Sequence, residues 1–272
     1  PRCSLKLVAC SFNIRISDIN VSGCDLRGID CFSASSIVAS CNVRTVGDIG
    51  INAGMINNCT SISTGHVAIT GFNVSNCWGI SNGATGIFAS HAGINCTGQS
   101  SVSDGINGGT LINCSGSSSG AGAGITSSIS VSQCYGSSAG GDGIHSSGTV
   151  ANSYGYSYST GALQDGIFAE RGVSNSYGIS KADCGIDSIG NVTNSYGITQ
   201  GSGDGIRAVN VMNSIGKAQT ASADDGISAT ATISYSRGSS ISAGTGVGLR
   251  ASIGIGSTSS GGQSITNKYN MP

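Results

Sequence analysis

Charged, aromatic and proline residues are scarce in this sequence. Its 272 residues include 12 basic and 13 acidic side chains, 2 prolines, and aromatic residues at 5%. The nearly balanced charge provides no broad cationic surface to contact phosphates, so nucleic acid is excluded as an expected partner. No run of 18 or more apolar residues occurs, so we expect no helix that spans a membrane.

Glycine and small residues take the place of the missing types. There are 45 glycines, while 38% of the residues are hydrophobic, which is too apolar for a flexible glycine and serine linker. We therefore expect an ordered chain without helical bundles or coiled coils. The sequence starts at Pro1 in place of Met, which is consistent with a fragment or with a mature chain after removal of a secretion signal.

A repeat of about 19 residues dominates the sequence. Gly-Ile pairs recur at intervals of 19 to 23 residues from Gly86-Ile87 to Gly226-Ile227, and Gly246-Val247 is a variant. Eight or nine residues after most of these pairs comes a second signature, which reads Asn-Cys-x-Gly early in the chain and Asn-Ser-Tyr-Gly later. Between these anchors, the apolar residues alternate with polar ones, as in Val173-Ser174-Asn175, which is the period of a strand.

These features predict an all-β fold, a single-domain parallel β-helix of roughly a dozen coils with about 19–21 residues per coil. Coils stacked at the strand spacing of about 4.8 Å would form a rod about 55–60 Å long. We expect the repeated Ile and Val to point inward as columns. Residues 1–45 are assigned to an N-terminal cap and the first irregular coils, 46–256 to the regular coils, and 257–272 to a C-terminal tail or docking segment.

One asparagine per repeat forms a column that we expect to be an inner structural ladder at a corner of the coil. Asn tolerates the left-handed conformation of a sharp bend, and stacked amides can hydrogen-bond from coil to coil. The column consists of Asn58, Asn76, Asn95, Asn113, Asn152, Asn175, Asn194 and Asn213. Here the chain resembles the right-handed parallel β-helix proteins of the pectate-lyase-like superfamily, over roughly residues 46–256. Right-handedness is implied by that resemblance.

Most of the 11 cysteines also form a column, in which Ser replaces Cys toward the C-terminus. The exchange of Cys for Ser indicates a small buried side chain, and no zinc-binding spacing accompanies it. Adjacent cysteines one coil apart could form disulfides or remain free thiols, and the second alternative is favoured. Cys3, Cys10, Cys24 and Cys31, near the N-terminus, are better disulfide candidates. The column is Cys24, Cys41, Cys59, Cys77, Cys96, Cys114 and Cys134.

Catalytic chemistry is weakly represented, and we expect no catalytic residues and no resident cofactor. Sugar-cleaving enzymes need an acid, a base or a bound cation, yet Glu170 is the sole glutamate. The best cluster is Asp165, Glu170 and Arg171, with Asp187 one coil on, and an ion-paired edge is the favoured interpretation. A broken acidic column before the repeated Gly is a candidate for calcium, although Asp-Gly is also an ordinary turn signal. It consists of Asp104, Asp142, Asp165, Asp204 and Asp225.

Two surface features are candidates for recognition or modification. An outward aromatic column follows the Cys and Ser column and could bind glycan, contact a partner or simply stabilise the coil; it contains Trp78, Tyr135, Tyr154, Tyr177 and Tyr196. Three Asn-x-Ser/Thr sites precede an inward Val and should face solvent, namely Asn20, Asn73 and Asn191. The sites at Asn58, Asn95 and Asn113 belong to the ladder, where we expect burial and no modification.

The leading functional hypothesis is a non-enzymatic extracellular or cell-surface structural protein. Near-uniform coils and scarce catalytic residues favour a rod that assembles into, or decorates, a surface fibre. An open coil end exposes unpaired backbone groups, so head-to-tail self-association is expected. The alternatives are a carbohydrate-binding or carbohydrate-active β-helix of lyase or hydrolase type, and an adhesin or phage-fibre segment.

Overall fold

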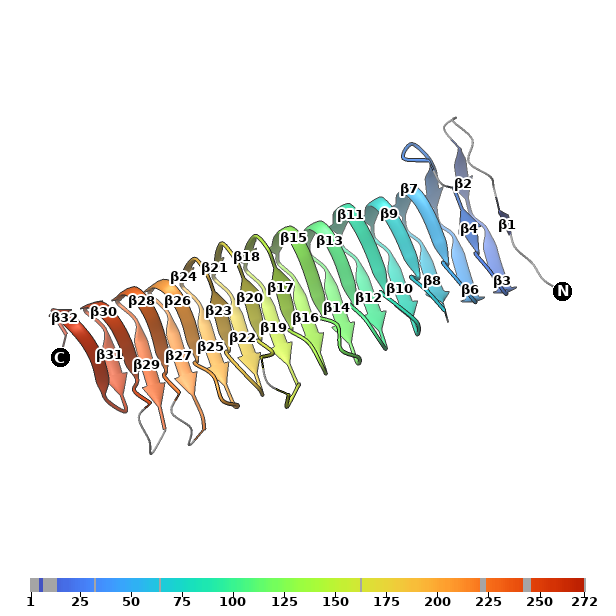
Figure 1. The fold of residues 1–272 in the computed structure, drawn as a ribbon. Helices are drawn as coiled ribbons and strands as arrows, with labels where there is room; N and C mark the ends of the chain where they lie inside the picture. Colours follow the sequence, from blue (N-terminus) through green and yellow to red (C-terminus); the bar gives the residue numbers. More distant parts are fainter. Residues whose placement is uncertain are drawn as a thin grey trace.

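The computed structural model describes residues 5–6, 14–31, 33–63, 65–161, 163–220, 224–241 and 246–271. In this part of the chain, every regular element is a β-strand, and all strands pair in parallel with the equivalent strands of neighbouring coils. The chain winds into a solenoid of about 12 coils, with β1–β3 at one end and β32 at the other (Figure 1). The sequence-based prediction of an all-β parallel solenoid is confirmed.

The larger sheet has 19 strands. Many coils contribute one long strand that contains both the repeated Ile and the repeated Val, and other coils contribute two short strands. Its strands are β1 (Leu5–Lys6), β2 (Arg15–Ser17), β4 (Ile29–Asp30), β5 (Ile37–Ala39), β7 (Ile51–Asn57), β9 (Ile69–Ser75), β11 (Ile87–Ile94), β13 (Ile106–Ile112), β15 (Ile125–Ser132), β17 (Ile144–Ser146), β18 (Thr149–Ala151), β20 (Ile167–Ala169), β21 (Gly172–Ser174), β23 (Ile186–Ser188), β24 (Asn191–Thr193), β26 (Ile206–Met212), β28 (Ile227–Ser234), β30 (Leu249–Ile255) and β32 (Gln263–Tyr269).

The smaller sheet has 13 strands, which follow one another along the rod in sequence order. Each coil contributes one short strand that begins directly after the Cys or Ser position in the regular repeats. Its strands are β3 (Asn20–Cys24), β6 (Asn42–Val46), β8 (Thr60–Ser63), β10 (Trp78–Ser81), β12 (Thr97–Ser100), β14 (Ser115–Ser118), β16 (Tyr135–Ser138), β19 (Tyr154–Ser157), β22 (Tyr177–Ser180), β25 (Tyr196–Thr199), β27 (Ile215–Ala218), β29 (Arg237–Ser240) and β31 (Thr258–Ser260).

The interior consists of stacked identical or similar side chains. Ile87 lies in register with Ile69 on one side and with Ile106 on the other, and all three are fully buried. Val150 is likewise paired with Val131 and Val173. Because parallel strands at this spacing place each residue directly over its counterpart, the repeat in the sequence becomes a continuous apolar column. The predicted inward Ile and Val columns are confirmed.

Two columns of glycine allow the two sheets to approach backbone to backbone. A Cβ atom added to Gly155 in the smaller sheet would lie 2.1 Å from the carbonyl oxygen of Gly166. A Cβ added to Gly166 would lie 2.3 Å from the backbone nitrogen of Ile179. In these coils, no side chain fits between the sheets at this position, so glycine is required there for space. In the first coils, Val43 and Ser61 occupy the equivalent position. Much of the unusual glycine content follows from this close approach.

Both ends of the described chain take part in the sheets. Strands β2 to β6 lie within residues 15–46, in the region assigned to a cap and irregular coils, and they pair with the regular coils that follow. Residues 258–269, assigned to a tail or docking segment, provide β31 and β32. Within the described ranges, no helix is long and apolar enough to cross a membrane.

Candidate functional site

The asparagine column lies at the corner between the two sheets. All eight of its members adopt the left-handed conformation, with φ from 47° to 56°, and Gln133 occupies the same position with φ 55°. The amide of Asn95 donates to Asn76 Oδ1 at 3.0 Å, and that of Asn113 donates to Asn95 Oδ1 at 2.9 Å. The predicted ladder is therefore present at the predicted corner.

The ladder is exposed, which corrects the expectation that it is an inner feature. Every one of its asparagine side chains is solvent-accessible, because the left-handed residue at the bend turns its side chain away from the interior. The residue that follows it points inward instead. The sites at Asn58, Asn95 and Asn113 were expected to be buried, and they are as exposed as those at Asn20, Asn73 and Asn191.

The Cys and Ser column lies directly inside this corner and connects successive coils. The backbone N–H of Cys59 donates to the sulfur of Cys77 at 3.4 Å, and that of Ser176 donates to Ser195 Oγ at 3.2 Å. Each thiol or hydroxyl in turn donates to the carbonyl oxygen two residues earlier, as from Ser195 to Thr193 at 2.7 Å. Cys and Ser are interchangeable here because both are small and both can accept and donate.

Cys24 does not belong to this column, contrary to the spacing-based prediction. The N–H of Asn42, which follows Cys41, donates to the carbonyl of Ile19, as that of Thr60 does to Cys41. Ile19 therefore occupies the column position in that coil. Cys24 lies in register with Val46, at the far end of its strand. The spacing of 17 residues from Cys24 to Cys41 matches the repeat, but this coil is irregular. The spacing therefore does not place Cys24 in the column.

The column cysteines from Cys41 to Cys134 are free, buried thiols. Of the two alternatives predicted for this column, the structure has free thiols and not disulfides. Cys31 is a free thiol as well. The hydrogen bond with Cys134, together with burial, raises the pKa of the Cys114 thiol to about 12. Such a thiol stays protonated at neutral pH and is a poor nucleophile. Cys3 and Cys10 lie outside the described residues.

The tyrosines next to this column form a stacked ladder on the outer surface. Tyr135, Tyr154, Tyr177 and Tyr196 stack in sequence, with ring centroids 5.3, 5.2 and 4.9 Å apart and planes within 11° of parallel. Trp78 faces outward at the same position, but Thr97 and Ser115 separate it from Tyr135. Because most ring faces contact one another, chiefly ring edges and hydroxyl groups are presented to solvent.

A shallow groove of about 960 Å³ runs along this corner. The asparagine column forms one wall, the tyrosine column forms the other, and the Cys and Ser column forms the floor; the groove extends from Asn95 and Thr97 to Asn213 and Ile215. It crosses seven coils, which corresponds to about 29 Å at the strand spacing. At its C-terminal end, the amine of Lys217 lies 5.2 Å from the Tyr196 ring centroid.

The acidic column forms hydrogen bonds that hold one coil to the next. One carboxylate oxygen of Asp104 accepts the N–H of Ala123 at 2.9 Å, and that of Asp142 accepts the N–H of Asp165 at 2.7 Å. Asp165, Asp204 and Asp225 bond in the same way to the corresponding residues of the next coils. Each bond provides an acceptor for the backbone N–H of the residue before the repeated glycine. The Asp residues therefore have a structural role, whether or not calcium binds.

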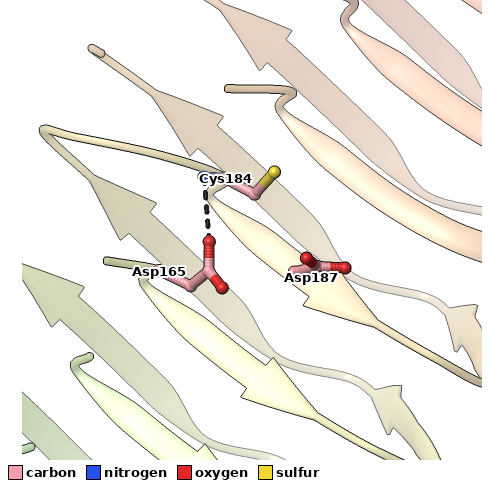
Figure 2. A group of neighbouring side chains, drawn as sticks. All are labelled: Asp165, Cys184 and Asp187. Atoms are coloured by element: carbon pink, nitrogen blue, oxygen red, sulfur yellow. Dashed lines mark hydrogen bonds between the residues drawn. The ribbon is translucent and has the colours of Figure 1, made fainter. Parts of the chain in front are cut away.

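The structure gathers Asp165 with Cys184 and Asp187 (Figure 2). One ligand-type atom from each side chain lies within 4.8 Å of the others. Burial is the main cause that raises the pKa of the Asp165 carboxyl well above its ordinary value, and neighbouring Asp142 and Asp187 add to the effect. Burial likewise raises the pKa of the Cys184 thiol well above the ordinary value.

Only part of the predicted cluster is found together. Asp187 lies near Asp165 as expected, whereas Glu170 and Arg171 are exposed beyond the end of β20, outside the group around Asp165. Cys184 was missed as a member. The sequence carried a signal for it, because Cys184 occupies a position that is acidic in most other coils and therefore lies directly over Asp165.

No protein-family model matches this chain, and neither the curated proteins nor the solved structures that were compared with it gave a match.

Proposed function

We propose that this protein is a non-enzymatic structural rod of an extracellular or cell-surface fibre. The observation that carries the proposal is the unbroken stacking of about 12 similar coils, in which each coil hydrogen-bonds mainly to its neighbours. Such a molecule is stiff along its axis because bending it would break parallel ladders on one side. Stiffness and a repeated surface are the properties that a fibre component needs.

Assembly by head-to-tail stacking is part of this proposal. In the described residues, β32 hydrogen-bonds to β30 alone, and most of its side chains are exposed. The outer edge of β32 therefore offers backbone donors and acceptors in the parallel geometry that the rest of the sheet uses. An edge of this kind favours addition of another strand. The first coil of a second copy is the proposed occupant.

Electron microscopy of the purified chain over a concentration series tests this proposal. We expect unbranched filaments with a subunit repeat near the estimated rod length of about 58 Å. Replacement of Ile265 by Lys in β32 should shift assembly to higher concentration, because the charge interferes with strand addition at that edge. Discrete particles of single rods at all concentrations would contradict head-to-tail assembly.

Carbohydrate binding along the corner groove is the second proposed function. The groove offers a row of exposed Asn amides opposite a row of tyrosine hydroxyl groups, and both are suited to hydrogen-bond a linear polysaccharide. A length of about 29 Å would accommodate several sugar units. Because most tyrosine faces are already stacked, recognition would depend on hydrogen bonds more than on ring stacking.

Glycan arrays on the intact protein test the second function. The triple replacement of Tyr154, Tyr177 and Tyr196 by Phe keeps the stack and removes the hydroxyl groups, so it should abolish glycan retention. The replacement of the same residues by Ala removes both the ring stack and the hydroxyl groups. Unchanged retention in the two variants would exclude this groove as the glycan site, and retention lost only with Ala would indicate a role for the stacked rings.

We also infer kinship with the pectate-lyase-like superfamily and a glycosylated, secreted state. The asparagine ladder at a corner of a parallel solenoid supports the first inference. Exposed Asn20, Asn73 and Asn191 support the second. Mass spectrometry of the protein from its natural source should find glycan on these residues, and unmodified peptides at all three positions would contradict it.

A further inference from the structure

The aspartates of the acidic column share a pattern, and Asp165 departs from it. In Asp104, Asp142, Asp204 and Asp225, one carboxylate oxygen accepts a backbone N–H and the other contacts a side-chain donor. Three of these donors stand three residues later in the sequence, and Arg250 serves Asp225. The donors are Asn107 at 2.9 Å for Asp104, His145 at 2.8 Å for Asp142, Arg207 at 3.3 Å for Asp204, and Arg250 for Asp225.

At Asp165, the residue three positions later is Phe168, which has no donor. Asp165 is 6% exposed, and one of its carboxylate oxygens accepts the N–H of Cys184 at 2.9 Å. No donor among the described residues bonds to the other oxygen, which Figure 2 shows on the side toward Asp187. This carboxylate oxygen is therefore available to coordinate a cation.

The other two members of the group have the chemistry of metal ligands. Cys184 is fully buried with its sulfur near Asp165, and Asp187 comes from the adjacent strand β23. We propose that Asp165, Cys184 and Asp187 bind a divalent transition-metal ion, of which zinc fits best. A thiolate ligand favours zinc or a similar soft ion over calcium and magnesium, which prefer oxygen alone.

The three ligand atoms must move slightly closer together to bind one ion. Ligand atoms on one tetrahedral zinc ion lie about 3.5 Å apart, given zinc–sulfur and zinc–oxygen bonds of about 2.3 and 2.1 Å. The present atoms lie within 4.8 Å of one another. Asp187 can supply the movement, since its side chain is 21% exposed while Asp165 and Cys184 are held in the interior. Three protein ligands leave a fourth position for water.

The charges around the group are compatible with an added cation. Arg207 contacts Asp187 at 3.3 Å, Asp204 at 3.3 Å and Asp183 at 3.7 Å, so carboxylates outnumber the guanidinium. Metal ligation requires Asp165 and Cys184 to be deprotonated. An ion with two positive charges that displaces two protons leaves the net charge of the site unchanged, and Arg207 keeps Asp183 and Asp204 as partners.

Titration of the intact, reduced protein with Co²⁺ and Zn²⁺ tests this proposal. Co²⁺ bound to a thiolate gives a sulfur-to-metal charge-transfer band and visible bands that report its geometry. We expect one equivalent of Co²⁺ to produce these bands and Zn²⁺ to remove them by competition. Because binding displaces protons, the apparent affinity should rise with pH. Ca²⁺ should not compete.

Variants separate this group from the other thiols of the chain. Cys184→Ala should abolish the charge-transfer band, and it should still fold, because Ala123 occupies the same position in another coil. Cys134→Ser is the matched control, since Ser is found in that column and the residue lies outside the group. Phe168→Asn should weaken Co²⁺ binding about tenfold by giving Asp165 the donor that Asn107 gives Asp104.

Two results would overturn the proposal. The first is the absence of any Co²⁺ band in the folded wild-type protein at neutral or higher pH. The second is a band of equal intensity in Cys184→Ala, which would place the metal on other cysteines. Circular dichroism of each variant establishes that it is folded, so loss of the band in Cys184→Ala with retention in Cys134→Ser assigns the site to this group.

Discussion

The coils from Cys41 to Cys134 and those from Ser153 to Ser236 fulfil the same structural need with different chemistry. In the first region, the backbone N–H at the corner donates to sulfur at 3.3 to 3.4 Å where such bonds form. In the second region, it donates to a serine oxygen at 3.0 to 3.2 Å. Sulfur is the weaker acceptor but the more apolar atom, so burial compensates for the poorer hydrogen bond.

The outer surface also changes along the rod, starting on the last cysteine coil, since Tyr135 follows Cys134. Trp78, Thr97 and Ser115 cover the cysteine coils without a continuous stack, and the asparagine amides next to them hydrogen-bond to one another. Stacked tyrosines cover the coils from Tyr135 to Tyr196. The comparison shows that the backbone hydrogen bonds and the inner columns define the coil. The corner positions, in contrast, accept several different residue types.

Glycine replacement should have the largest effect on stability. The effect should be the same in both regions. We expect Gly98→Ala and Gly155→Ala each to lower the free energy of unfolding by about 3 kcal/mol, because each Cβ would lie 2.1 to 2.2 Å from a backbone oxygen of the facing sheet. Urea unfolding followed by circular dichroism measures both. A mild effect in one region alone would show that the sheets can separate there.

Removal of a corner acceptor should have the next largest effect. Ser195→Ala leaves the buried N–H of Ser176 without its acceptor and should cost about 2 kcal/mol. Ser195→Cys keeps an acceptor and should cost less than about 1 kcal/mol, as should the reverse change Cys134→Ser. Thermal unfolding of the three variants is the measurement. Equal losses for Ser195→Ala and Ser195→Cys would mean that the hydrogen bond contributes little.

The tyrosine stack should contribute a smaller amount. Tyr177→Ala removes stacking contacts on both sides and should cost about 1–2 kcal/mol, whereas Thr97→Ala at the same position of a cysteine coil should cost less than about 0.5 kcal/mol. Thermal unfolding monitored by tyrosine fluorescence distinguishes the two. A neutral Tyr177→Ala would leave recognition as the remaining reason for the stack.

His145 provides a pH-dependent contact within the coil that lies where the two regions meet, and its effect should be the smallest. Its hydrogen bond with Asp142 at 2.8 Å raises the pKa of the imidazole. The stabilisation is therefore full below the unfolded pKa of about 6.5 and is lost as pH rises through the folded pKa. Since His145 is 41% exposed, the effect should be below about 1 kcal/mol.

Urea unfolding of wild type and His145→Gln at pH 5 and pH 8 measures this contribution. The wild type should exceed the variant in stability by more at pH 5 than at pH 8. A constant difference between the two proteins would show that protonation of His145 does not contribute.

Particular residues show where sequence-based prediction succeeded and failed. The asparagine ladder and the inward Ile column were predictable because strand period and repeat length determine which residues stack. Cys24 was misplaced because spacing alone does not reveal an irregular coil, and it pairs with Val46. The ladder was predicted as buried, whereas the left-handed bend directs those amides outward.

The sequence alone determined the solenoid, its coil length, and most of the residues that stack in each column, because a repeat in parallel strands places like over like. Only the tertiary structure decided how the columns face one another. It brought the two glycine columns into contact, made the corner a groove, and placed Cys184 and Asp187 beside Asp165, which has no second donor among the described residues. These features depend on the distance between sheets and on side-chain direction, which one-dimensional periodicity does not contain.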